Sequence, residues 1–159
     1  MTVTVRPAER RDLQALGRLG ATLLRTHYAF DEQRFLAPFE GVERGYAAFL
    51  GGVLRDDDGR VFVATDADAV IGYVYAALEP LSWKELRGPA GFIHDVVVEE
   101  ASRHTGVATA LLEAAIAWLR ERGAPRVILW TAARNEAAQA LFARRFGFRE
   151  TMIEMTLEL

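Results

Sequence analysis

The feature that most constrains the fold is a strand–loop–helix unit in the middle of the chain. Residues 91–98 form an apolar run, which predicts a strand that is buried on both faces. Residues 99–105 are polar, and residues 106–122 then carry apolar side chains around most of a predicted helix. A central strand that leads through a short loop into a buried helix is typical of an α/β domain.

The loop before this helix has the composition of an anion-binding site. The first amides of a helix lack partners and its dipole is positive there. Gly106 and Ala108 are small enough for a diphosphate to reach the backbone, while Arg103 adds a charge and Thr109 a hydroxyl. Spacing alone leaves open an ordinary connecting loop. Both common nucleotide patterns are missing, because no Gly-Lys-Ser/Thr occurs and the loop has one late glycine.

The rest of the chain predicts a mixed sheet with helices on both faces. The element order is β-α-α-β-β-β-α-β-α-β, with antiparallel hairpins before strand–helix–strand units. Gly72 within a predicted strand indicates a bulge or the close approach of another group. The predicted strands are residues 3–6, 60–64, 70–78, 91–98, 127–131 and 151–157, and the predicted helices are the region opened by Pro7 and residues 42–54, 106–122 and 135–146.

Length and composition exclude several classes of protein. The 159 residues suit one domain over residues 1–159, and the formal charge of -3 argues against a nucleic-acid partner. The absence of cysteine excludes disulfides, thiolate metal sites and a cysteine nucleophile. No metal site is expected. The chain shows neither an 18-residue apolar stretch nor a signal peptide, so we expect a cytoplasmic protein without a membrane partner.

Three segments together resemble the GNAT superfamily of acyl-CoA-dependent N-acyltransferases. Arg103-x-x-Gly106-x-Ala108 matches its Arg/Gln-x-x-Gly-x-Gly/Ala signature. Residues 135–148 resemble its Asn-x-x-Ala-x-x-Leu-Tyr-x-x-x-Gly-Phe segment, and residues 70–73 resemble its hairpin strand. The resemblance implies an α/β (α+β) fold with a GNAT-like mixed, largely antiparallel sheet of six to seven strands and helices on both faces.

The resemblance also implies where acetyl-CoA binds as co-substrate. The fourth and fifth strands are expected to splay apart around its pantetheine arm, and the amide of Val98 to polarise the thioester carbonyl. The loop amides are expected to hold the pyrophosphate. The implied cofactor-binding residues are Val96, Val97, Val98, Arg103, His104, Thr105, Gly106, Val107, Ala108, Thr109, Asn135 and Phe142.

The implied reaction is direct attack by a primary amine of a small molecule or protein on the thioester, in a ternary complex. Such attack needs a base, because a protonated amine has no lone pair. The chain departs from its relatives at two catalytic positions. Phe142 stands where many members carry a tyrosine acid, and Trp130 stands where some N-terminal acetyltransferases carry glutamate.

His94 and Glu79 are the candidate catalytic residues. His94 lies four residues before Val98, so the strand period predicts that both point to the same side and Asp95 to the other. A structural histidine bonded to a backbone carbonyl is the alternative. Glu79 would be a second base or an anchor for a cationic substrate, with a solvated role as the alternative. Aromatic and acidic residues at 27–39 favour a small cationic amine.

Two other functions stay open. A non-catalytic acyl-CoA-binding or sensing module on the same fold is favoured by the missing tyrosine and glutamate. A partner-binding domain would bind no CoA. The resemblance also allows a homodimer.

Overall fold

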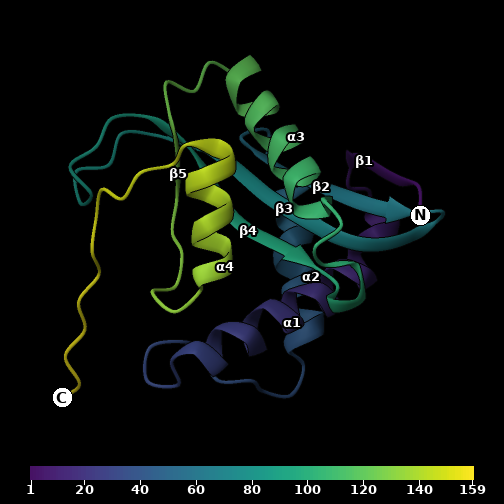
Figure 1. Ribbon diagram of the computed structural model, residues 1–159, viewed down its shortest axis with the longest axis horizontal. Coiled ribbons are helices and arrows are strands. Elements are labelled where there is room, and N and C mark those ends of the chain that lie inside the picture. Colours follow the sequence, from purple (N-terminus) through teal and green to yellow (C-terminus); the bar gives the residue numbers. More distant parts are fainter.

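The computed structural model describes residues 1–159, which form one five-stranded sheet covered by helices (Figure 1). The strands lie in the order β1-β2-β3-β4-β5, and every pairing is antiparallel except that of β4 with β5. The strands are β1 (Val3–Pro7), β2 (Gly59–Asp66), β3 (Ala69–Glu79), β4 (Ala90–Val98) and β5 (Val127–Leu129), and the helices are α1 (Leu13–Phe30), α2 (Val42–Val53), α3 (Val107–Glu121) and α4 (Glu136–Ala140).

Two hydrophobic cores lie on opposite faces of the sheet. One joins α1 and α2 to the sheet and contains Leu16, Leu50 and Tyr73. The other joins α3 to the sheet and contains Val74 and Leu111. Each fully buried leucine stabilises the fold by about 1.5–3 kcal/mol. The prediction of helices on both faces is therefore confirmed, because successive residues of a central strand serve opposite cores.

Two glycines on α1 let α2 come unusually close. A Cβ at Gly17 would lie 2.4 Å from the carbonyl oxygen of Glu43. A Cβ at Gly20 would lie 2.1 Å from Cδ1 of Tyr46. The ring of Tyr46 therefore occupies the space that any side chain at position 20 would fill, and its hydroxyl reaches the sheet.

The central strands carry two irregularities that shape the site. Gly72 on β3 pairs with Val98, and a Cβ there would lie 2.7 Å from the carbonyl oxygen of Val97. This close approach of β4 explains the predicted strand glycine. The β3–β4 register shifts between Tyr75 and Ala76, which pair with Asp95 and Ile93, so His94 is the extra residue of a β-bulge.

The segment after β5 is helical but not uniformly α-helical. The predicted helix over residues 135–146 is observed as α4 followed by a π-helical turn over Leu141–Arg145. Such turns are frequent at functional sites. The fifth strand is also shorter than predicted and ends at Leu129.

The prediction of six to seven strands is wrong, because the sheet has five. The predicted last strand, residues 151–157, has the period-two pattern of a strand but pairs with nothing. A strand exists only where a neighbour supplies hydrogen-bond partners, and a pattern cannot show whether one is present. Among the helices, none combines the length and the apolar character that crossing a membrane requires.

Candidate functional site

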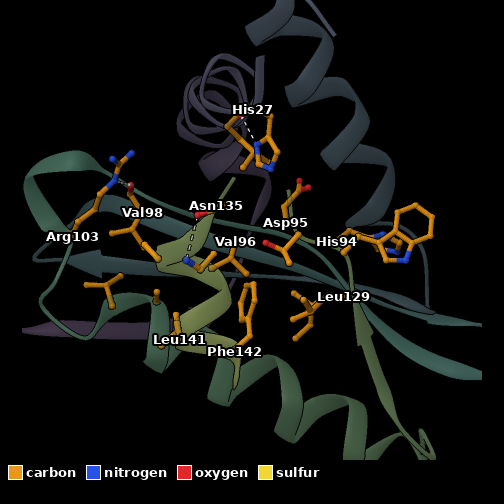
Figure 2. Close-up of a pocket in the computed structure, with 18 of the residues that line it drawn as sticks. His27, His94, Asp95, Val96, Val98, Arg103, Leu129, Asn135, Leu141 and Phe142 are labelled. Atoms are coloured by element: carbon orange, nitrogen blue, oxygen red, sulfur yellow. Dashed lines mark hydrogen bonds between the residues drawn. The ribbon is translucent and has the colours of Figure 1, made fainter. Parts of the chain in front are cut away.

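A cavity of ≈ 590 Å³ opens where β4 and β5 separate (Figure 2). The two strands pair only through residues 91–93 of β4 and 127–129 of β5, so the C-terminal half of β4 has no neighbour on that side. The predicted splay is therefore present. The cavity extends from the loop before α3, past α4, to residues of α1 and α2.

One end of the cavity is a row of free backbone donors. The N–H groups of residues 104–109 form no hydrogen bond within the protein. Gly106, the N-cap of α3, has φ = 88°, and His104 has φ = 62°. Left-handed residues within such a loop turn successive amides toward one point and form an anion-binding concavity. The helix dipole adds positive potential at the same place.

The side chains of this loop take different parts. Arg103, His104 and Gly106 line the cavity together with residues 107–109. The guanidinium Nε of Arg103 donates to the carbonyl oxygen of Val98 at 3.3 Å. Thr105 does not line the cavity, because its hydroxyl donates to the carbonyl oxygen of Ser102 at 2.6 Å and closes the loop.

The free edge of β4 forms the middle of the cavity. The N–H of Glu99 donates to Ile71 on β3, and neighbouring residues of a strand direct their polar groups to opposite sides. The backbone groups of Val96 and Val98 consequently face the opening toward β5. Val97 points into the core beneath α1 and α2 and does not line the cavity.

Asn135 and Phe142 enclose the cavity from α4 and the turn after it (Figure 2). The side-chain oxygen of Asn135 accepts from the N–H of Ala138 at 3.2 Å, so it caps the helix while lining the cavity. The ring of Phe142 is buried and meets Phe148 edge to face at 6.0 Å. It can pack against a ligand but has no proton to donate.

His94 and Glu79 meet at the other end. Nε2 of His94 lies 2.9 Å from Oε1 of Glu79, and the imidazole lies between the rings of Tyr75 and Phe92. His94 lines the cavity, whereas Glu79 does not. If Glu79 accepts from Nε2–H, Nδ1 of the neutral ring keeps its lone pair.

The β-bulge overturns the predicted orientation of His94. The ring of His94 contacts the ring of Tyr75 at a tilt, Asp95 accepts a hydrogen bond from Tyr73, and both tyrosines lie on the same face of β3. His94 and Asp95 therefore share a face, while Val98 faces the opposite core. The inserted residue interrupts the period of two, so counting four residues back from Val98 led to the wrong side.

Asp95 is the centre of a cluster that the sequence analysis undervalued. Its Oδ2 accepts from the hydroxyl of Tyr46 at 2.7 Å and from that of Tyr73 at 3.0 Å. Burial raises the pKa of Asp95, although the two tyrosine hydrogen bonds act to lower it. Burial and the neighbouring Asp95 charge raise the pKa of both tyrosines, so they stay protonated donors. Oδ1 of Asp95 has no partner in the protein.

His27 faces this carboxylate across the cavity (Figure 2). Its Nδ1 lies 2.9 Å from the carbonyl oxygen of Leu23, which can only accept. Nδ1 therefore carries the proton and Nε2 is free. Tyr28 and Asp31 do not line the cavity, and Asp31 instead accepts backbone N–H groups of its own turn.

The Asp95 cluster gave only a partial signal in the sequence. Its members lie on α1, α2, β3 and β4, and no local motif joins them. An acidic residue in an apolar strand was the one visible hint, because such a group needs polar partners when buried. No three His, Cys, Asp or Glu side chains gather in a metal-binding arrangement.

Comparison with known proteins identifies the group to which the chain is similar. Residues 22–148 match the family model described as the acetyltransferase (GNAT) family. An uncharacterized N-acetyltransferase of Methanocaldococcus jannaschii is 35% identical over 96 residues, which is 60% of this chain and 41% of that protein. N-alpha-acetyltransferase 30 of Schizosaccharomyces pombe is 36% identical over 87 residues, 55% of each chain. The match thus spans about half the length of these curated relatives.

Solved structures show the same fold at lower identity. A protein described as a transcriptional regulator from Bacillus halodurans has a TM-score of 0.76 and 21% identity, over 99% of this chain and all of that chain. The aminoglycoside N-acetyltransferase AAC(6')-Iy, in complex with CoA, has a TM-score of 0.78 and 20% identity, over 99% of this chain and 95% of that chain.

Proposed function

Since the chain belongs to the acetyltransferase (GNAT) family, we propose that it transfers an acetyl group from acetyl-CoA to a primary amine in a ternary complex. One observation carries the proposal. A row of six unpaired amides stands at one end of a cavity whose other end holds the Asp95 carboxylate. The first end suits a diphosphate and the second an ammonium group, and the free edge of β4 connects them.

The residues of the first end fit acetyl-CoA. The amides of residues 104–109 would hold its pyrophosphate, and the side chain of Arg103 would add a second positive group. The exposed backbone of Val96 and Val98 would pair with the pantetheine arm. Phe142 would pack against the arm, and Asn135 would contact it. Acetyl-CoA supplies the activated acyl group. The proposed location is the cytoplasm, which suits a chain without cysteine.

The second end favours a small primary amine with an apolar body. Oδ1 of Asp95 offers a free acceptor to an ammonium group. Burial raises the pKa of Asp95, and a cation bound beside it would stabilise its charged form. The surrounding side chains are mostly apolar: Leu23, Leu24, Phe35, Leu36 and Trp130. The proposed acceptor therefore presents one cationic nitrogen to Asp95 and an apolar body to this lining.

The chain's own groups account for each step of the reaction. Asp95 orients the amine, and His94, held by Glu79, takes the proton that the ammonium nitrogen must lose before it can attack. The N–H of Val98 stabilises the negative charge that develops on the thioester oxygen. The new C–N bond forms as the C–S bond breaks, and the leaving thiolate takes a proton from solvent, since Phe142 has none to give. The products are an amide and free CoA.

A non-catalytic acyl-CoA-binding module is the second candidate. Phe142 is the observation that favours it, because its ring replaces the hydroxyl that many relatives use as an acid. This candidate predicts acetyl-CoA binding without turnover of any amine.

The test is calorimetric titration of acetyl-CoA into the wild type, Gly106→Glu and the control Gly123→Glu. Both glycines have left-handed backbones, with φ of 88° and 80°, and a Cβ at either position meets nothing within 4 Å. The two variants therefore share the strain and the added charge, but only position 106 lies in the cavity. We expect micromolar binding to the wild type and to Gly123→Glu, and at least 100-fold weaker binding to Gly106→Glu.

Equal binding to all three proteins would reject the proposed diphosphate site at residues 104–109, and no binding to the wild type would reject both candidates. A panel of primary amines, assayed by release of free thiol, then separates the enzyme from the binding module.

A further inference from the structure

Lys84 is the only lysine of the chain, and it lies in the exposed loop between β3 and β4. All other basic side chains among the 19 are arginines. A guanidinium stays protonated in proteins and has no free lone pair, whereas the amine of a lysine can lose its proton and attack. Lys84 is therefore the one side chain of this protein that has the chemistry of the proposed acceptor, a primary amine on an apolar stem.

The loop over residues 80–89 holds Lys84 in a defined position. The backbones of Ser82 and Arg87 exchange two hydrogen bonds, of 3.0 and 3.2 Å, and close a turn with four residues between them. The side-chain oxygen of Ser82 accepts from the N–H of Glu85 at 3.2 Å inside this turn. The turn therefore presents its four central residues as one ordered unit.

The ammonium group of Lys84 is free, and its neighbours are apolar. It takes part in no hydrogen bond or ion pair, because the adjacent Glu85 is paired with Arg87 instead. Trp83 is 84% exposed and Leu86 is 88% exposed. Apolar side chains that gather on a surface mark an interaction site. The turn thus combines a free cation with two apolar side chains that nothing in the protein covers.

The amine end of the cavity complements this turn in charge and in polarity. Oδ1 of Asp95 is an acceptor without a partner in the protein. Leu36 and Trp130 line the same end and are 64% and 72% exposed. A lysine that reaches Asp95 would bring the apolar side chains beside it against these two residues, and the contact would remove apolar surface of both partners from water.

The loop does not deliver Lys84 to the cavity of its own chain. It ends before Ala90, the first residue of β4, whereas Asp95 lies five residues further along that strand, roughly 17 Å away. Figure 1 shows the loop projecting from the sheet in the direction opposite to the course of β4. One lysine side chain does not span this distance, so Lys84 must enter the cavity of another copy.

We propose that Lys84 is itself an acceptor of the acetyl group, which passes to it from acetyl-CoA bound to a second copy during a transient encounter. The proposal rests on the acetyltransferase function proposed above. Nζ of Lys84 loses a proton to His94 of the second copy and attacks the thioester carbon. The C–N bond forms as the C–S bond breaks, and the thiolate takes a proton from solvent. The products are an acetylated lysine at position 84 and free CoA.

The test is the intact mass of the protein after incubation with acetyl-CoA. The wild type should gain about 42 Da, the mass of one acetyl group, and peptide mapping should locate it at Lys84. Lys84→Arg should show no gain at this position and should turn over small amines like the wild type. Because the transfer occurs between copies, the fraction modified in a given time should rise with protein concentration.

Three variants separate recognition of the loop from simple exposure of a lysine. Lys84→Arg combined with Arg120→Lys moves the lysine to an exposed position of α3, where it should be modified at least tenfold more slowly. Trp83→Glu keeps Lys84 in the loop without its apolar neighbour and should slow the modification to a similar extent. Gly106→Glu keeps Lys84 but should not bind acetyl-CoA, so it should be modified only when Lys84→Arg is added as the active partner.

Three results would overturn the proposal. An unmodified Lys84 in a protein that acetylates small amines would reject Lys84 as an acceptor and leave the proposed function intact. Equal rates for lysines at positions 84 and 120 would contradict recognition of the loop. Modification of Gly106→Glu alone, as fast as in the mixture, would identify a spontaneous reaction. If neither Lys84 nor any small amine is acetylated, the proposed function fails as well. Circular dichroism of each variant identifies any loss of folding.

Discussion

Gly20→Ala should disturb the proposed amine site from the far side of α1. The added Cβ would lie 2.1 Å from Cδ1 and 2.4 Å from Cγ of Tyr46. Because Cγ lies on the Cβ–Cγ axis about which the ring turns, rotating the ring cannot relieve the contact with Cγ. The side chain must swing away from α1 or α2 must shift. Either movement takes the hydroxyl of Tyr46 off Asp95, which it now reaches at 2.7 Å.

Three contributions set the size of the effect. Alanine in place of glycine within a helix stabilises by about 1 kcal/mol. Overpacking a well-filled contact costs about 1–3 kcal/mol. Loss of a hydrogen bond to a charged group costs about 1.5–3 kcal/mol, and the partial exposure of Tyr46 favours the lower end. The expected net loss is about 2–3 kcal/mol, which lowers the Tm by about 5–10 °C for a chain of this length.

Differential scanning calorimetry and steady-state kinetics measure the two consequences. Gly45→Ala is the control, because a Cβ at this exposed position of α2 meets nothing within 4 Å. It should raise the Tm by about 2–4 °C through helix propensity alone. Gly20→Ala should also raise the KM for the amine at least tenfold while leaving acetyl-CoA binding unchanged. A rise in Tm for Gly20→Ala similar to that of Gly45→Ala would refute the packing argument.

Three further predictions concern charged groups. Asp12 is buried and paired with Arg6 at 2.8 Å, and this hydrogen bond lowers the pKa of Asp12. The ion pair therefore stabilises the folded protein at neutral pH, and this stabilisation is lost as the pH falls through the folded-state pKa of Asp12. Asp12→Asn should cost about 2 kcal/mol at pH 7, seen in urea unfolding, and the difference from the wild type should shrink at low pH; an equal difference at both pH values would contradict this account. Burial raises the pKa of Asp95, so its ionisation destabilises the fold as the pH rises through that pKa. Asp95→Asn should therefore keep or raise the Tm at pH 7 while weakening amine binding at least tenfold. A lower Tm with normal amine kinetics would show that Asp95 has a structural role only. His94→Gln should lower kcat at least 100-fold with an unchanged KM for acetyl-CoA. Glu79→Gln should lower kcat less, because the oxygen of the new amide can still accept a hydrogen bond from Nε2–H of His94. Normal turnover by His94→Gln would show that His94 is not the base.

Most of the fold followed from local patterns. The apolar residues 91–98 predicted β4, and helical spacing predicted α2 and α3 to within one or two residues. These signals are strong because each element buries a face whose period matches its own geometry. The period-two pattern of residues 151–157 is of the same quality. This pattern did not predict the sheet correctly, because alternation indicates an extended strand but does not show which strand it would pair with.

The two ends of the cavity differ in how far the sequence revealed them. The row of free amides lies in one continuous segment, the end of a loop and the first turn of α3, so Arg103 and Gly106 at fixed spacing identified it. The amine end is assembled from four elements, and its geometry depends on the bulge at His94. A bulge adds one residue without any residue type that demands it, so strand periodicity placed His94 and Asp95 on opposite faces.

The sequence by itself determined the types of most elements, the helices on both faces of the sheet, the family and the loop that precedes α3. Each of these depends on residues that are neighbours along the chain or that repeat with a fixed period. The tertiary structure decided the separation of β4 from β5, the meeting of Tyr46, Tyr73 and Asp95, and the absence of a partner for the last strand. Those features depend on contacts between distant segments, and they form only where packing brings the segments together.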